Sequence, residues 1–299
     1  MIKIAFSDKF LYELPEGHRF PIRKYELIKD QLLYENIINE DQLFDPGIAE
    51  KEILLAHDKK YFEKVKSLEL SRSEIRTLGI PIHEKSVGRA LNSIAGTVHS
   101  AISSKKLGAG INIGGGYHHA FADHGEGFCI FNDLAVAARY LIKNKLAENI
   151  LILDLDVHQG NGTANILAND KEVFTFSMHG QKNYPIRKEK SNLDIMLPDL
   201  TRDREYLKIL KDSLDTVFKE FIPDFILYQA GVDILESDKL GRLAISLNGC
   251  RLRDDFVLKI AKEHKIPISI TLGGGYSPAI KDVVDAHVNT IRMAMENFG

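Results

Sequence analysis

Six short apolar runs recur along the chain, and stretches with helical periodicity lie between them. The runs are KIAF near the start, GINI at 110–113, ILIL at 150–153, VFTF at 173–176, FILYQ at 225–229 and ISITL at 268–272. Strands that alternate with helices predict βαβ units and a mainly parallel sheet. ILIL and ISITL are apolar on both faces, which indicates a sheet covered on both sides. We therefore expect an α/β fold with three layers.

Helical periodicity is clearest at residues 86–105, and residues 203–220 and 277–297 show the same pattern. Residues 179–199 are polar, lack periodicity and contain two prolines, so we predict a long surface loop there. The sequence contains no repeat, low-complexity segment or clear linker. We expect residues 1–299 to form one domain.

The composition restricts the class of protein. The chain has 299 residues, of which 44% are hydrophobic, and a net charge of −3 without a basic block, so nucleic acid is not an expected partner. The opening MIKIAF resembles a strand rather than a signal peptide, and no apolar run reaches the roughly 18 residues of a membrane span. Two cysteines, Cys129 and Cys250, are too few for a disulfide framework. We expect a cytoplasmic protein that does not bind membranes.

Glycines or polar residues follow five of the apolar runs. The motifs are, in chain order, GGGYHH, DLDVHQGNG, SMHG, AGVD and GGGY. Any single motif is compatible with an ordinary turn. In open α/β sheets, however, ligands bind beyond the carboxyl ends of the strands. Five such motifs together predict a functional site at that edge.

Three of these residues form a candidate metal site. Asp156 and His158 occupy alternate positions, so in an extended chain they point to the same side, and Asp233 ends another strand. One histidine and two carboxylates leave coordination positions open, as catalytic metal sites do. Zn²⁺ fits this set, and Fe²⁺, Mn²⁺ and Co²⁺ also remain possible. The structural alternative is a pair of polar strand ends bonded to nearby amides.

Other motifs supply candidates for proton transfer. His118 and His119 follow three glycines, and a tight turn can bring both rings to one cavity as a general base and an electrostatic partner, or as metal ligands. Tyr276 also follows three glycines, and its phenol can donate to a developing oxyanion. The chain has no GxGxxG, GxxxxGK[ST] or GxSxG motif, which argues against a nucleotide site and a serine hydrolase.

Taken together, the motifs resemble the histone deacetylase and acetoin-utilisation superfamily, which has the arginase/deacetylase fold. The resemblance extends over nearly the whole chain. It includes GHRFPIRKYELI (17–28), AHDKKYFEKV (56–65), GGGYHHAFADHGEGFCIFND (114–133), AGVDILESDKLGRLAIS (230–246) and LGGGY (272–276). QGNG, where many members have HGDG, and GHRFP are most similar to the class IV branch and its bacterial relatives.

The resemblance implies roles for individual residues. The implied metal ligands are Asp156, His158 and Asp233, and the implied catalytic residues are His118, His119, Tyr276, Asp154 and Asn161. His119 would be the general base and His118 its electrostatic partner, oriented by Asp154. Asn161 stands where many members have an acid. An amide can fix the tautomer of His119 but cannot stabilise its imidazolium by charge.

The resemblance also implies a second ion and a substrate channel. The expected potassium ligands are Asp154, Asp156, His158, Ser177 and Met178, partly through backbone carbonyls. The expected channel residues are Gly127, Phe128, Tyr184 and Gly274. Phe128 would form one wall of the channel and Tyr184 the other.

The function implied is hydrolysis of acyl groups, acetyl or longer, from lysine side chains of a protein or peptide by metal-activated water. Deacylation of small amines such as polyamines, or ester hydrolysis, are alternatives with the same site. A ureohydrolase would need a second acid near Asp233, but Ile234 and Leu235 follow it. An inactive acyl-lysine binding module would be expected to lack a ligand or the tyrosine, and this chain retains them.

Overall fold

A computed structural model describes residues 1–299, and its centre is an eight-stranded sheet. The strands, in chain order, are β1 (Lys3–Ala5), β2 (Leu43–Phe44), β3 (Ala109–Asn112), β4 (Ile150–Asp154), β5 (Val173–Gly180), β6 (Leu193–Leu197), β7 (Phe225–Gln229) and β8 (Ile268–Thr271). Their order in the sheet is β2-β1-β3-β8-β7-β4-β5-β6. Every pair of neighbours is parallel.

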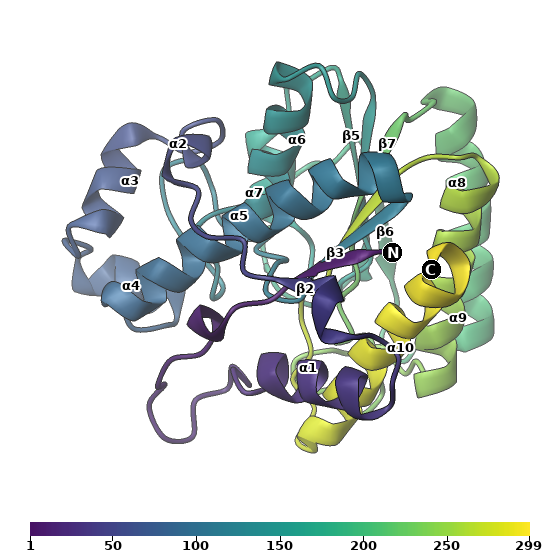
Figure 1. The fold of residues 1–299 in the computed structure, drawn as a ribbon, viewed down its shortest axis with the longest axis horizontal. Coiled ribbons are helices and arrows are strands. Elements are labelled where there is room, and N and C mark those ends of the chain that lie inside the picture. Colours follow the sequence, from purple (N-terminus) through teal and green to yellow (C-terminus); the bar gives the residue numbers. More distant parts are fainter.

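Ten α-helices connect the strands and cover the sheet (Figure 1). They are α1 (Lys24–Tyr34), α2 (Glu50–Ile53), α3 (Lys59–Lys66), α4 (Arg72–Leu78), α5 (Glu84–Leu107), α6 (Asp133–Lys143), α7 (Asn161–Ile166), α8 (Asp203–Glu220), α9 (Leu247–Glu263) and α10 (Ile280–Phe298). Short 3-10 turns occupy Asp8–Phe10 and Glu40–Gln42. No helix combines the length and the apolar character needed to cross a membrane.

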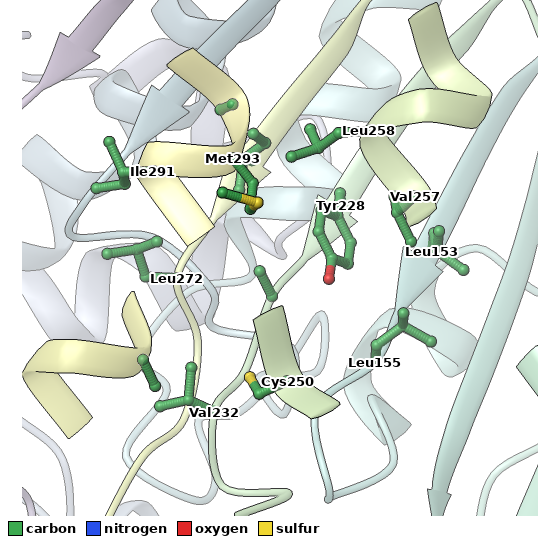
Figure 2. Close-up of a cluster of buried hydrophobic side chains, with 14 of the residues drawn as sticks. Leu153, Leu155, Tyr228, Val232, Cys250, Val257, Leu258, Leu272, Ile291 and Met293 are labelled. Carbon is green, nitrogen blue, oxygen red and sulfur yellow. The ribbon is translucent and has the colours of Figure 1, made fainter. Parts of the chain in front are cut away.

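The sheet separates two hydrophobic cores, because successive side chains of a strand point to opposite faces. In β4, Leu151 and Leu153 belong to one core, and Ile150 and Ile152 to the other. The first core includes residues of α1, α8, α9 and α10, and the second includes residues of α2 to α7. Figure 2 shows part of the first core around Tyr228. The predicted three-layer α/β architecture is therefore confirmed.

The predicted elements agree with the structure except at one edge. The six predicted strands are present, and the predicted helices correspond to α5, α8 and α10. The loop predicted at 179–199 is confirmed at residues 181–192 but wrong at both ends, because β5 continues to Gly180 and residues 193–197 form β6. Strand β6 lies at the sheet edge and is mostly half-exposed, so it lacks the apolar signature of the central strands. SMHG consequently lies inside β5 and does not follow it.

Four neighbouring strands bring the remaining motifs together. Strands β3, β8, β7 and β4 are adjacent in the sheet and parallel, so their carboxyl ends meet at one edge. GGGYHH follows β3, GGGY follows β8, AGVD follows β7, and LDVHQGNG follows Asp154 of β4. This edge is therefore the place where the candidate side chains meet.

Candidate metal centre and catalytic site

The three predicted metal ligands form one buried group. Asp156 and His158 follow β4, and Asp233 follows β7, its neighbour in the sheet. Their ligand atoms all lie within 4.8 Å of one another. Nδ1 of His158 is 3.1 Å from Oδ1 of Asp156 and 3.0 Å from Oδ2 of Asp233. The fold thus brings together residues that are 75 positions apart.

The electrostatics of this group suit a bound cation. Burial and the nearby charge of Asp156 raise the pKa of Asp233 to about 7. Burial alone would lower the pKa of His158, but the two carboxylates raise it to about 10. Without a metal ion, the two buried carboxylates hold a proton on the imidazole of His158. A divalent ion bound there would displace that proton and supply positive charge in its place. One nitrogen and two oxygen donors are a ligand set that Zn²⁺ and Fe²⁺ accept, so the residues present fit a divalent ion.

The backbone comes unusually close to the two carboxylates at Gly274. Its N–H donates to Oδ2 of Asp156 at 2.8 Å. A Cβ atom at Gly274 would lie 1.9 Å from Oδ2 of Asp233, so no side chain fits there. The buried Lys24 ammonium donates to the carbonyl oxygen of the preceding Gly273 at 2.6 Å. Gly274 therefore holds the carboxylate of Asp156 and leaves room for that of Asp233. The sequence predicts only a substrate contact for this residue.

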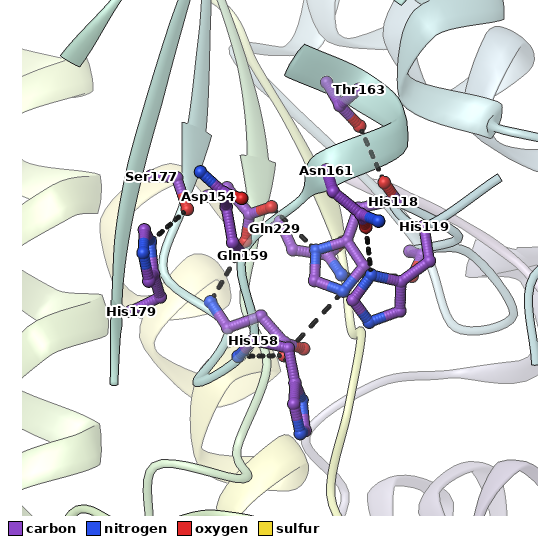
Figure 3. A network of polar contacts seen from close by, with 12 residues as sticks. His118, His119, Asp154, His158, Gln159, Asn161, Thr163, Ser177, His179 and Gln229 are labelled. Atoms are coloured by element: carbon purple, nitrogen blue, oxygen red, sulfur yellow. Dashed lines mark hydrogen bonds and ion pairs between the residues drawn. The ribbon is translucent and has the colours of Figure 1, made fainter. Parts of the chain in front are cut away.

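His118 and His119 lie side by side, each with a different partner (Figure 3). Nδ1 of His118 is 2.7 Å from Oδ2 of Asp154. Nδ1 of His119 is 2.7 Å from Oδ1 of Asn161. The glycine turn makes this placement possible: Gly116 has a φ of 107°, in the region that favours glycine. Both predicted pairings are present in the structure.

The two histidines differ in charge because their surroundings differ. Burial disfavours the charged form of His118, but Asp154 and Asp156 raise its pKa to about 9. Burial, followed by the positive charges of His118 and His158, holds the pKa of His119 well below its ordinary value. When two neighbouring groups have different pKa values, one can act as the general acid and the other as the general base. His119 is suited to accept a proton, and His118 to carry one.

A channel with a volume of about 250 Å³ leads from the surface to this group. Its lining includes His119, His158, Phe128, Tyr184 and Tyr276. The channel also contacts Gly127, where a Cβ would come within 2.6 Å of the His119 ring. Of the predicted channel residues, Gly127, Phe128 and Tyr184 line this channel and Gly274 lines a smaller inner cavity; their contact with substrate stays a prediction.

Two of the residues predicted to bind potassium, Asp156 and His158, belong to the candidate metal site, and the other three lie on β4 and β5. Asp154 and Ser177 face each other in the register of β4 and β5, and Met178 follows Ser177. Oγ of Ser177 is 2.9 Å from Nδ1 of His179, a ring that burial keeps neutral by lowering its pKa to about 4. Potassium binding at these residues stays a prediction.

Several supporting residues were not identified from the sequence. Buried Arg253 donates from Nη1 to the carbonyl oxygens of Leu155 and Gly231, at 3.3 and 2.5 Å, and so joins the segments that carry Asp156 and Asp233. Glu126 accepts a hydrogen bond from Asn161 at 2.9 Å. No local motif signals either contact, because each joins residues far apart in the chain.

Comparisons with known proteins identify the family of this chain. Residues 18–291 match the family described as the histone deacetylase domain. An uncharacterised protein of Picosynechococcus is 38% identical, with 99% of each chain covered. Histone deacetylase 2 of Arabidopsis thaliana is 30% identical (95% of this chain, 76% of the other), and the acetoin utilization protein AcuC of Staphylococcus aureus is 32% identical (91% and 76%).

A solved structure shows the same fold. The crystal structure of an HDAC homolog complexed with SAHA superposes with a TM-score of 0.86, covering 99% of this chain and 84% of the other, at 24% identity. The fold is therefore that of the deacetylases. This chain belongs to the histone deacetylase and acetoin-utilisation superfamily, and its family and fold indicate a hydrolase.

Proposed function

We propose that this protein is a metal-dependent amidohydrolase that removes acyl groups from lysine side chains. The observation that carries this proposal is the buried group of Asp156, His158 and Asp233 at the foot of a channel that His119 and Tyr276 also line. The channel's aromatic walls fit an extended aliphatic stem, with the acyl group innermost. Family membership supports an acylated substrate.

Each residue has a distinct part in the proposed reaction. A divalent ion bound by the three ligands would act as a Lewis acid toward the acyl carbonyl and the attacking water. His119 accepts the proton of that water, since its low pKa leaves it neutral. Tyr276 donates a hydrogen bond to the oxyanion. Burial, followed by the charges of Asp233 and Asp156, raises the pKa of Tyr276 well above the ordinary value, so its hydroxyl keeps the proton that it donates. His118 or His119 then protonates the leaving amine.

The inner cavity favours a short acyl group. It encloses about 20 Å³ beside His118, Asp156 and Gly274, roughly enough for one water molecule or methyl group. We therefore expect acetyl-lysine peptides to have a higher kcat/KM than longer acyl-lysine peptides. A panel from acetyl to myristoyl, with an acetylated polyamine and an ester of matched size, tests both substrate class and chain length. A preference for the polyamine or the ester would overturn the choice of acyl-lysine.

We further propose zinc at the metal site, with Fe²⁺ as the alternative, and potassium near Asp154 and Ser177. The sequence QGNG favours the class IV branch of the family. Residues 1–299 would act as one catalytic domain. Cys129 and Cys250 are both free and buried, which favours a reducing compartment such as the cytoplasm.

Metal affinity is predicted to fall as pH falls. In the metal-free protein the raised pKa of His158, about 10, keeps its ring protonated at neutral pH, so binding must release that proton. Above the pKa of Asp233, about 7, the apparent Kd for Zn²⁺ should rise about tenfold for each unit of decrease in pH; below it the rise should be steeper, because Asp233 must then lose a proton as well. Competition with a chromogenic chelator at several pH values measures this slope. A Kd that does not change with pH would show that no proton leaves the site.

The pH profile tests the partner of His119. A carboxylate at position 161 should raise the pKa of His119 by about one unit or more, and a base must be unprotonated. The acidic limb of kcat/KM should therefore move to higher pH. The introduced carboxylate would face that of Glu126, so we specify Asn161→Asp combined with Glu126→Gln, which restores a donor between the two side chains. If the acidic limb of kcat/KM does not move in the double variant and its metal content is unchanged, then His119 is not the base or Asn161 is not its partner.

A further inference from the structure

The side-chain amide of Asn161 is bound at both ends. Its Oδ1 lies 2.7 Å from Nδ1 of His119, and its Nδ2 donates to Oε1 of Glu126 at 2.9 Å. Glu126 precedes Gly127 in the loop that lines the channel, and its side chain is 16% exposed. The hydroxyl of Tyr184 donates to the same Oε1. Glu126 thus connects a channel wall with the partner of His119.

The charge on Glu126 decides which way the amide of Asn161 points. Burial would raise the pKa of Glu126, but His124, whose Nε2 is 3.8 Å from Oε2, and hydrogen bonds from Tyr184 and Asn161 hold the pKa below its ordinary value, so the carboxyl is ionised. An ionised carboxylate only accepts hydrogen bonds. Asn161 must then turn its NH₂ group toward Glu126 and its oxygen toward His119.

The proton position on His119 follows from this orientation. An amide oxygen only accepts, so Nδ1 of His119 must carry the hydrogen, which leaves the lone pair on Nε2. An asparagine amide by itself can present either end, so Asn161 alone does not select a tautomer. The carboxylate of Glu126 selects the tautomer, because it can only accept a hydrogen bond and so fixes which end of the Asn161 amide faces His119.

We propose that Glu126 is a positioning residue that sets the tautomer of His119 through the side chain of Asn161. The inference depends on the proposed function only in treating His119 as the base. Tyr184 adds a second link, since its ring meets the ring of His119 edge-on with centroids 5.0 Å apart. Glu126 therefore also orients the channel wall above the base.

Nitrogen NMR tests the tautomer directly. Zinc-loaded protein labelled with ¹⁵N in its histidine rings gives separate signals for protonated and unprotonated ring nitrogens, and His119→Gln assigns those of His119. We expect Nδ1 to be protonated in the natural protein, and both tautomers to be present in Glu126→Gln. Tyr184→Phe is the matched control: it removes a different hydrogen bond to Glu126 and should leave one tautomer. A natural protein with the proton on Nε2 would overturn the proposal without any variant.

Kinetics give an independent readout of the same role. Glu126→Gln should lower kcat by up to about tenfold with little change in KM, because part of the population retains the correct tautomer. Glu189→Gln is a second control, since that carboxylate accepts from the exposed amide of Asn165 at 3.4 Å. A single Nδ1-protonated tautomer in Glu126→Gln, with natural kcat, would refute the inference. Absence of hydrolysis in a natural protein that shows the predicted tautomers would instead refute the proposed function.

Discussion

Replacing Asp233 by asparagine is expected to reduce turnover to the background rate and to remove most of the bound metal. The substitution keeps the size of the side chain but removes one of the two carboxylate charges in the buried group. Asp233 also accepts a hydrogen bond from the backbone N–H of Val157 at 2.9 Å, which an amide oxygen can preserve. The fold should therefore survive. Elemental analysis and a peptide hydrolysis assay on the same samples measure the two effects.

The control for this prediction is Asp215→Asn, which changes an exposed aspartate on α8 and should leave metal content and turnover unaltered. His158→Ala should reproduce the loss seen with Asp233→Asn, because both residues belong to the same group. Retention of full metal content in Asp233→Asn, or two stoichiometric transition metals in the natural protein, would contradict the single-ion site.

Replacing Tyr276 by phenylalanine is expected to lower kcat by about 10²–10³-fold, or roughly 3–4 kcal/mol, with a much smaller change in KM. The substitution keeps the ring, which packs near Phe128 with centroids 6.2 Å apart, and removes only the hydroxyl. The effect falls on kcat because an oxyanion donor acts in the transition state more than in the bound substrate. Steady-state kinetics with an acetyl-lysine peptide measure the effects on kcat and on KM separately.

Metal content should be unchanged in Tyr276→Phe, which separates this effect from loss of the ion. Tyr34→Phe serves as the control, because Tyr34 is 87% exposed and remote from the channel. A Tyr276→Phe variant with near-natural kcat would show that the hydroxyl is not the oxyanion donor.

The central part of the site was predictable because simple geometry determines it. Alternate residues of an extended segment share a side, which is why the sequence predicts that Asp156 and His158 point together. In the structure both lie in a bend just after β4, and their side chains still meet. Parallel strands end at one edge of a sheet, so Asp233 and Tyr276 had to approach that pair once their strands became neighbours. What the residues alone left open was the division of roles between His118 and His119, which the structure explains through Asp154 and Asn161.

The supporting contacts were not predictable, because they depend on packing between distant segments. Arg253 lies in α9 with no exposed surface, where a charged pair with Asp254 interrupts the apolar pattern of an otherwise amphipathic helix. Glu126 is 35 residues from Asn161, so no local pattern links the two side chains. Strand β6 was missed for a related reason: an edge strand is half-exposed and lacks a continuous apolar run.

The most direct test of the proposed function is hydrolysis of an acetyl-lysine peptide by metal-stripped protein to which zinc is returned in measured steps. We expect no turnover without metal, full turnover at one zinc ion per chain, and release of free lysine side chain and acetate in equal amounts. Protein that binds one zinc ion at Asp156, His158 and Asp233 and still hydrolyses no acyl-lysine peptide would contradict the proposed function.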